Sequence, residues 1–333
     1  MRSNKNVETL ALKHGETLKK EFNNYVDMAT SAVDWTLFCT YQLKPNFSEG
    51  VYKILKLPSM QISYTHMSGG VMFDFVSPEG CITFSLMQNI HQKACIDQMK
   101  LETGMIAVTD DTKVYNLVCS DRVEMIDISL NENADPLLLK KLRKIVDNYV
   151  LDDNQKMGML LKGIIDEYAQ VTCINEHNSE KIEQHITECM LQILDIQEVQ
   201  IPHFSKSELI ALEIKRDFFK HMDHTKSVSE LAKHYHISEK SLQNSFKALF
   251  NLTPNQYMRI LKLNLVHHEL IQGSTDQISV SKIARKWGFS HMGRFSKYYK
   301  ELFGENPSVT LKMARPVIDG MQVHCVERQE EVE

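Results

Sequence analysis

Two segments near the C-terminal end of the chain carry side chains suited to the base edges and phosphates of nucleic acid. The first segment offers polar and basic residues at helical spacing: Lys240, Ser241, Gln243, Asn244 and Lys247. The second segment offers His291, Met292, Gly293, Arg294 and Lys297. Lys and Arg suit guanine edges or phosphates, Asn can pair with adenine, and a Met side chain can lie against a thymine methyl group. A solvated helix face explains any one of these residues equally well, but it is a poor explanation of both sets together.

The two segments belong to an internal repeat. Residues 231–238 match residues 283–290 at an offset of 52, and after one inserted residue the match continues from 242–254 to 295–307 at an offset of 53. Each copy predicts a short helix, a tight turn and a second helix, which is the helix-turn-helix arrangement. Apolar residues recur at helical spacing in both second helices and predict the face that turns inward. The polar residues are therefore expected on the free face.

An apolar residue followed by a serine in each turn supports this prediction. Ile237 in the first copy and Phe289 in the second are expected to fill the angle between the two helices. Ser238 and Ser290 are expected to cap the second helices, because a serine hydroxyl accepts from the free backbone N–H groups at a helix start. A tight turn with such a cap would present the second helix of each copy to DNA.

A long helix is predicted between the copies, beginning at Pro254 and ending near Gly273. Its length of roughly 27 Å at 1.5 Å per residue is close to the roughly 34 Å between successive major-groove faces of B-DNA. One chain could therefore read a bipartite site. Arg259 on this helix is expected to contact phosphate, and the adjacent His267 and His268 are also placed near phosphate.

Charge is distributed unevenly along the chain. Residues 205–312 hold 17 Lys and Arg against 10 Asp and Glu, a net charge of +7, whereas the whole chain carries −5. Such polarisation is expected when one part of a protein meets phosphate and the rest does not.

The stretch GFSHMGRFSKYYKELFGENPS resembles the signature of the AraC/XylS transcription regulators, and the resemblance covers about residues 205–312. It implies that bases are read by Lys240, Asn244 and Gln243 in the first unit and by Met292, Gly293 and Lys297 in the second. Gly293 departs from what a reading position needs, because it has no side chain and weakens a helix. Fewer direct base contacts are therefore expected from the second unit.

Within the family, PNQYMRILKLNLVHHELI and KWGFSHMGRFSKYYKELFGENPSVTL resemble the ethanolamine-utilisation regulators. That resemblance implies ethanolamine with a cobalamin as inducers. The residues themselves establish no cofactor.

The N-terminal part predicts a different kind of structure. Residues 50–130 contain short apolar segments separated by turn residues, as in a small antiparallel sandwich or barrel, and the family resemblance implies a cupin-like form. Helices are predicted from Pro136 onwards. The last of them repeats apolar residues that either form a homodimer contact or pack on their own domain: Ile182, Ile186, Met190, Ile193 and Leu194.

The predicted class is therefore α+β, with a cupin-like antiparallel β domain and flanking helices followed by an all-α domain of two helix-turn-helix units joined by a long helix. The predicted divisions are a sensor and dimerisation domain at 1–197, a linker at 198–205, a DNA-binding domain at 206–312 and a flexible acidic tail at 313–333. With 333 residues, two domains are expected.

Catalytic and metal chemistry find little support. The strand region offers His66 and His91 on separate segments and no HxH pair, and neither a phosphate loop nor a nucleophile elbow is present. A ligand pocket inside the sheet remains open, with candidate lining residues that are as easily core: Tyr64, His66, Phe73, Phe75 and Phe84. The seven cysteines form no closely spaced set and are read as reduced thiols.

The sequence thus predicts a non-enzymatic, sequence-specific DNA-binding transcription regulator, an activator that responds to a small molecule. The expected partners are double-stranded DNA, RNA polymerase, the effector and a second copy of the chain. No run approaches the roughly 18 apolar residues of a membrane span, so a cytoplasmic location is expected. The alternative is a DNA repair or modification protein with a reactive cysteine, for which Cys119 is the candidate nearest a cation.

Overall fold

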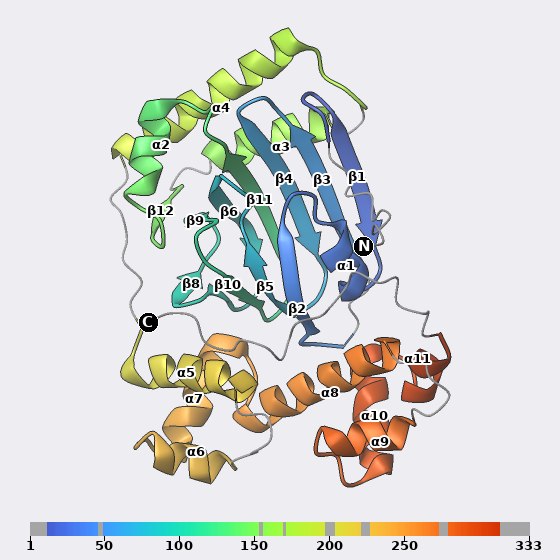
Figure 1. Ribbon diagram of the computed structural model, residues 1–333. Helices are drawn as coiled ribbons and strands as arrows, with labels where there is room; N and C mark the ends of the chain where they lie inside the picture. Colours follow the sequence, from blue (N-terminus) through green and yellow to red (C-terminus); the bar gives the residue numbers. More distant parts are fainter. Residues whose placement is uncertain are drawn as a thin grey trace, which may run out of the picture.

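A computed structural model describes residues 12–45, 49–152, 156–168, 171–196, 204–220, 227–272 and 279–313. The described elements lie in four layers: a group of helices, a large β-sheet, a small β-sheet and a second group of helices (Figure 1). This arrangement confirms the predicted α+β class, with an antiparallel cupin-like β domain followed by an all-α domain. Residues 314–333, most of the predicted acidic tail, lie outside the described residues, as does most of the predicted linker.

The large sheet has seven strands paired antiparallel. In spatial order they are β1 (Thr17–Phe22), β3 (Gly50–Lys56), β4 (Met60–Met67), β11 (Val123–Leu130), β6 (Ile82–Ile90), β9 (Met105–Asp110) and β12 (Tyr149–Leu151). Two of the turns that separate the apolar segments, at residues 68–70 and 77–80, connect β4 to β5 (Val71–Val76) and β5 to β6. Gly50 pairs with Phe22, whose ring would lie 1.9 Å from an added Cβ atom, so a side chain at position 50 would displace that ring.

The small sheet faces the large one and has five strands. In spatial order they are β2 (Thr36–Gln42), β5 (Val71–Val76), β10 (Tyr115–Cys119), β7 (Ala94–Ile96) and β8 (Met99–Leu101). Strand β2 lies at the edge, and its pairing with β5 shifts register between Phe38 and Tyr41. Helix α1 (Tyr25–Ser31) precedes it, and the Asn24 side chain caps that helix.

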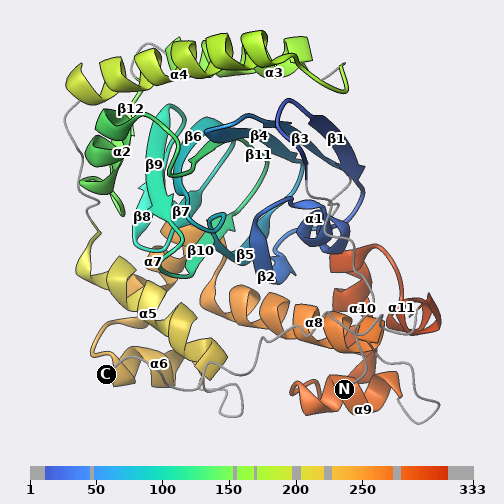
Figure 2. The same cartoon turned by 45° about the horizontal axis from the view of Figure 1, so that its top comes forward.

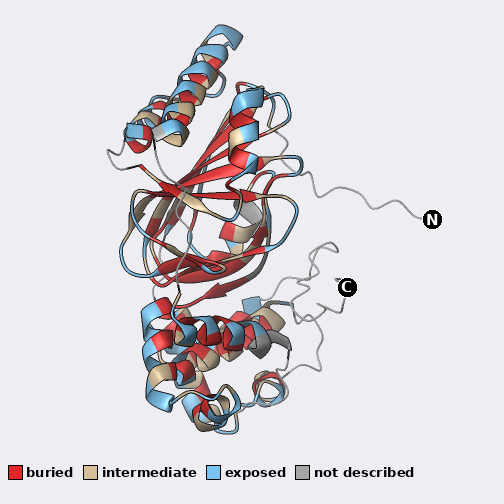
Figure 3. Cartoon of the chain, turned by 90° about the vertical axis from the view of Figure 1, so that its left-hand side faces the viewer, coloured by how far each residue is buried: buried red, intermediate tan, exposed pale blue. Residues whose placement is uncertain are grey.

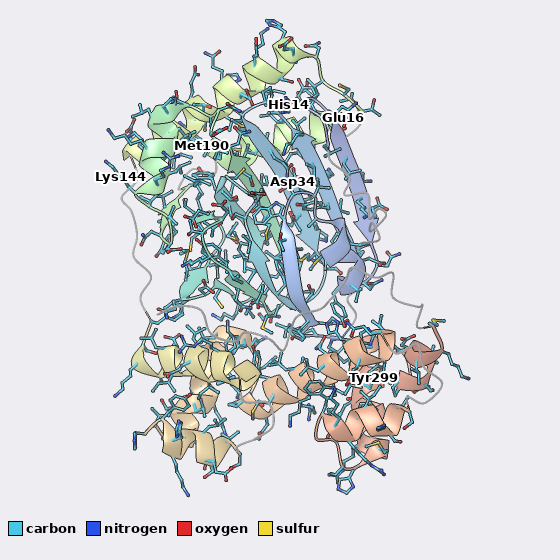
Figure 4. All side chains as sticks on the ribbon, in the orientation of Figure 1. His14, Glu16, Asp34, Lys144, Met190 and Tyr299 are labelled. Atoms are coloured by element: carbon cyan, nitrogen blue, oxygen red, sulfur yellow. The ribbon has the colours of Figure 1, made fainter. Side chains whose placement is uncertain are left out.

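Three helices cover the outer face of the large sheet: α2 (Pro136–Arg143), α3 (Lys156–Tyr168) and α4 (Glu176–Ile196) (Figure 2). Ile182, Ile186 and Met190 of α4 are buried in the core that these helices share with the sheet, and Met190 is labelled in Figure 4. The apolar face of α4 therefore packs on its own domain, the second of the two sequence interpretations. Figure 3 shows the same segregation, with buried residues in the strands and on one side of these helices.

The described residues of the C-terminal part form seven helices: α5 (Lys206–Lys220), α6 (Val228–His234), α7 (Glu239–Phe250), α8 (Pro254–Gln272), α9 (Val280–Lys286), α10 (Met292–Phe303) and α11 (Pro307–Met313). Helices α6 and α7 form the first helix-turn-helix unit, and α9 and α10 form the second. They lie at opposite ends of α8 (Figures 1 and 2). Helix α8 begins at Pro254 as predicted.

The internal repeat is also a repeat of backbone conformation. Ser227 and Ser279 cap α6 and α9 at equivalent positions. The turns place His236 at φ 54° and Gly288 at φ 85°, both left-handed and 52 residues apart. The residues that end α7 and α10, Asn251 and Gly304, are again left-handed and 53 residues apart. Asn and Gly tolerate this conformation, so different sequences produce the same unit.

One predicted cap is confirmed and the other is wrong. The Ser238 hydroxyl accepts from the Ser241 N–H at 3.0 Å at the start of α7. Helix α10 begins one residue later than the repeat alone suggests, so His291 occupies the N-cap position and makes no side-chain capping hydrogen bond. Ser290 falls outside the cap because the inserted residue lies in the second turn.

The two aromatic residues of the second unit differ in burial. Phe295 is 1% exposed and packs on Tyr299, whereas Phe289, which we expected to fill the helix angle, is half-buried. Phe295→Ala should lower the free energy of unfolding by about 3–5 kcal/mol, as for a core aromatic. Phe289→Ala should cost less, because less apolar surface is buried. Denaturant unfolding followed by circular dichroism measures both losses, and equal losses would contradict this packing.

Candidate nucleic-acid interface

The first unit exposes most of its predicted base-reading side chains. Lys240, Gln243, Asn244 and Lys247 are exposed on α7, while the opposite face of the helix is buried. Ser241 is half-buried. The spacing of three to four residues places Lys240, Gln243, Asn244 and Lys247 on one side of the helix. A row of donors and cations on a capped helix is an arrangement that can enter a major groove and read base edges.

The second unit presents a different face. His291, Gly293, Arg294 and Lys297 are exposed, and Met292 is half-buried against the core of its own unit. The Lys297 Nζ lies 3.9 Å from the Glu301 Oε1 on the same exposed helix face. An exposed ion pair of this kind contributes little free energy, so the Lys297 side chain stays available for other contacts. Open space surrounds the position that a Gly293 side chain would take. The backbone of α10 is therefore accessible at its start.

Arg259 lies on the linking helix and contacts the second recognition helix. It is half-buried on α8, and its guanidinium carbon lies 4.1 Å from the centroid of the Tyr298 ring on α10. Stacking on an aromatic ring leaves the guanidinium edge free to donate hydrogen bonds. A phosphate contact by Arg259 remains a prediction.

The histidines predicted near phosphate on α8 are at a domain contact instead. His267 is 9% exposed and stacks on Phe303 with ring centroids 4.1 Å apart. Burial lowers the pKa of His267 to about 3, and burial also lowers the pKa of His268. Both imidazoles are therefore neutral, and the prediction of phosphate proximity is wrong. Tyr299, which shares a hydrogen bond with His267, is labelled on α10 in Figure 4.

A chain of buried hydrogen bonds joins the β domain to α8 and α10. The Gln42 backbone N–H donates to the Asn264 side-chain oxygen at 2.8 Å, and the Asn264 amide donates back to the Gln42 carbonyl at 2.8 Å. The Gln42 side chain donates to the Leu302 carbonyl at 2.7 Å. His268 Nε2 lies 2.7 Å from the Thr40 carbonyl. Strand β2 is thus hydrogen-bonded to the linking helix α8 and to the C-terminal end of the second recognition helix, α10.

An interior cavity lies between the two sheets. It has an empty volume of about 600 Å³, part of it open to solvent. Phe73 and Phe75 line it as the sequence suggested, but Tyr64 and Phe84 pack in the core on the outer side of the large sheet. The lining also includes Trp35, which the sequence analysis did not consider.

Cys119, the cysteine considered for the alternative of a repair protein, is unsuited to thiol chemistry. Cys119 is 1% exposed, and burial raises the pKa of its thiol well above the usual range. A buried neutral thiol is a poor nucleophile. Among the described residues, no group of three or more His, Cys, Asp and Glu could hold a metal ion, and no helix in the described ranges is long and apolar enough to cross a membrane.

Comparison with known proteins agrees with this geometry. Residues 231–313 match a family described as a helix-turn-helix domain. A probable thc operon regulatory protein of Rhodococcus erythropolis is 32% identical over 92 residues, which cover 28% of each chain. The XylDLEGF operon transcriptional activator of Pseudomonas putida is 26% identical over 210 residues, 58% of this chain and 65% of that protein.

Over residues 231–313 the chain is therefore similar to helix-turn-helix transcription regulators. Both relatives are named as regulators of operons. The matched segments span from about a quarter to just under two thirds of those relatives' own lengths. A solved structure of the AraC-like transcriptional activator CuxR is also similar, with 9% identity, a TM-score of 0.37 and coverage of 80% of this chain and 86% of that one.

Sequence reasoning missed the residues that join the helix-turn-helix domain to the β domain. Strand β2 was not predicted, because the register shift after Phe38 breaks the two-residue alternation that marks a strand. A signal existed in Asn264, a polar residue between Leu263 and Leu265 in an apolar stretch of the helix. A buried amide in such a place requires partners.

The exposed positions lead to a test of base reading. Lys240→Ala and Asn244→Ala should each lose about 1–3 kcal/mol of discrimination at particular base pairs, because each removes a base-edge contact. Arg259→Ala should instead weaken binding to all sequences alike and lower the salt slope by about 1, since a phosphate contact carries no sequence information. Binding selections from a randomised duplex library measure the preference. An Asn244→Ala protein with unchanged sequence preference would show that α7 docks by another face.

The β2 contact leads to a second test. Asn264→Ala leaves the Gln42 N–H and carbonyl buried without partners, which should cost about 1–3 kcal/mol. Hydrogen exchange followed by mass spectrometry should show faster exchange in a peptide covering residues 36–43, while strands β4 and β11 keep their protection. His234→Ala, at an exposed position in α6, is the matched control and should change neither. Unaltered exchange in β2 would mean that this contact does not hold the strand.

Proposed function

We propose that the protein is a sequence-specific DNA-binding transcription activator that reads a bipartite duplex site with one chain. The observation that carries the proposal is the pair of helix-turn-helix units with the same backbone and two exposed polar faces, held at opposite ends of α8. A relative with similarity over 58% of this chain is named as an operon transcriptional activator, which supports activation. RNA polymerase is then a partner.

The described length of α8 supports reading by a single chain. Its 19 residues give a length of about 28 Å at 1.5 Å per residue, which is comparable to the roughly 34 Å between successive major-groove faces on one side of B-DNA. The net charge of +7 between residues 205 and 312 favours contact with phosphate along this span. A single chain can therefore contact two successive major grooves without forming a homodimer. The homodimer stays a prediction.

The interior cavity is proposed as the effector site, with β2 as its connection to the DNA-binding domain. Trp35, directly before β2, and Leu37 within it line the cavity. Thr40 and Gln42, further along the same strand, bind α8 and α10. A ligand that moves the first half of β2 therefore also moves the second half. The ligand can shift the equilibrium between two positions of the strand only by the difference between its binding free energies for those positions.

Ethanolamine with a cobalamin, which the sequence resemblance implies, stays the first pair of inducers to test. The cavity is large enough for ethanolamine. A cobalamin is much larger than this space, so it would have to bind at another surface. A cytoplasmic location also stays a prediction.

Footprinting of the purified protein on its own upstream DNA tests the proposal, at two salt concentrations and with or without ethanolamine plus cobalamin. The expected result is a discrete protected site that covers two successive major-groove faces and persists at the higher salt. A change in protection on adding the pair would support the inducer prediction. Weak protection along the whole duplex that disappears with salt is the signature of non-specific binding and would contradict sequence-specific regulation.

A further inference from the structure

The interior cavity has two unlike walls. The small sheet and the segment before it contribute apolar side chains, among them Trp35, Phe73, Phe75 and Leu117. The large sheet contributes Thr65, Ser85 and Asp127 beside apolar neighbours. A molecule that fills the space therefore meets an aromatic wall on one side and polar oxygen atoms on the other.

Asp127 is the charged group of this cavity. It is 5% exposed in the middle strand of three, with Ser63 and Ser85 directly opposite on the neighbouring strands. The Ser85 hydroxyl donates to one carboxylate oxygen at 2.6 Å, and the Ser63 hydroxyl donates to the other at 3.5 Å. No Lys, Arg or His of the described residues forms an ion pair with it. Burying a carboxylate without a cation is costly, so neutral hydroxyl groups alone compensate it poorly.

Burial raises the pKa of Asp127 to about 6, and a cation beside the carboxylate would favour its ionised form. A cation at hydrogen-bond distance would offset the cost of burial directly.

Trp35 supplies a second polar group in the lining of the cavity. Its indole Nε1–H is buried and has no acceptor among the described residues. The ring of Trp35 lies 5.6 Å from that of Phe75, and Phe73 lies 6.1 Å from Phe75 on the same wall. Faces of aromatic rings attract cations, and a buried indole N–H requires an acceptor. The wall is thus suited to a cation that also carries an oxygen acceptor.

We propose that the cavity binds a small organic cation, with its ammonium group on Asp127 and its body against the aromatic wall formed by Trp35, Phe73 and Phe75. This inference rests on the proposed function in treating the cavity as the effector site. Ethanolammonium is the smallest member of the class considered, and alkyl- and aralkylammonium ions would fill more of the volume. Carboxylate ligands of the same shape are excluded by repulsion from Asp127.

The inference is tested by ligand binding to the full-length protein, without DNA. Ethanolammonium, butylammonium and benzylammonium are compared with butanol, benzyl alcohol, butyrate and benzoate by calorimetry and by thermal shift at pH 7.5. At least one ammonium ion should bind and raise the melting temperature, and its alcohol and carboxylate counterparts should bind roughly ten-fold more weakly or worse. This comparison uses the unaltered protein and does not depend on a variant that folds.

Asp127→Asn keeps the shape of the side chain and removes its charge. The affinity for the ammonium ion should fall by roughly ten-fold or more, whereas Glu132→Gln, which removes one exposed negative charge, should leave it unchanged. Carboxylates that bind as well as ammonium ions, no binding by any ammonium ion, or an Asp127→Asn protein with full affinity would each overturn the inference. None of these outcomes changes the footprint expected on DNA without a ligand. The proposed function and the ligand class are therefore tested separately.

Discussion

The five-stranded sheet is buried on both faces, and the other parts of the molecule are arranged around that constraint. Its inner face forms the cavity and the core shared with the large sheet. Its outer face contributes Tyr41, Met72, Cys95 and Val118 to a core that continues into the first helix-turn-helix unit. Backbone in a sheet moves as a unit with its hydrogen-bonded neighbours, so a change on one face is felt on the other. The five-stranded sheet is therefore the single layer that separates the first helix-turn-helix unit from the proposed effector site.

Strand β2 of this sheet contacts the helices of the C-terminal part. It is an edge strand, it pairs with β5 alone within the sheet, and its register shifts in the middle. Its free edge is covered rather than left to pair with another chain, because Thr40 and Gln42 bond to α8 and α10. Edge strands must be covered or blunted to avoid association. Here the cover is the DNA-binding domain, so protection of the edge and contact between the domains are the same interaction.

The sequence was informative where structure repeats a local pattern. The two helix-turn-helix units, the start of α8 at Pro254 and the turns after β4 and β5 follow from residue types at fixed spacing. The prediction of an N-cap at Ser290 was wrong because the one inserted residue moved the start of α10. An alignment of the two copies does not show at which position of the turn that residue is inserted. Strand β2 and the carboxylate of Asp127 were missed because their meaning depends on partners 222 residues away, as for Gln42 and Asn264, or on strands that meet only in the folded sheet.

The two units share a backbone but differ in the faces that they expose. Helix α7 carries Lys240 and Asn244 where α10 carries Gly293 and Lys297 at the equivalent positions. A symmetric dimer binds a palindromic site because its two recognition helices are identical and related by a two-fold axis. Two different recognition helices in one chain are related by no such axis. A site read in this way has a direction, so the protein sits on the duplex in one orientation and presents the same flank to whatever assembles beside it.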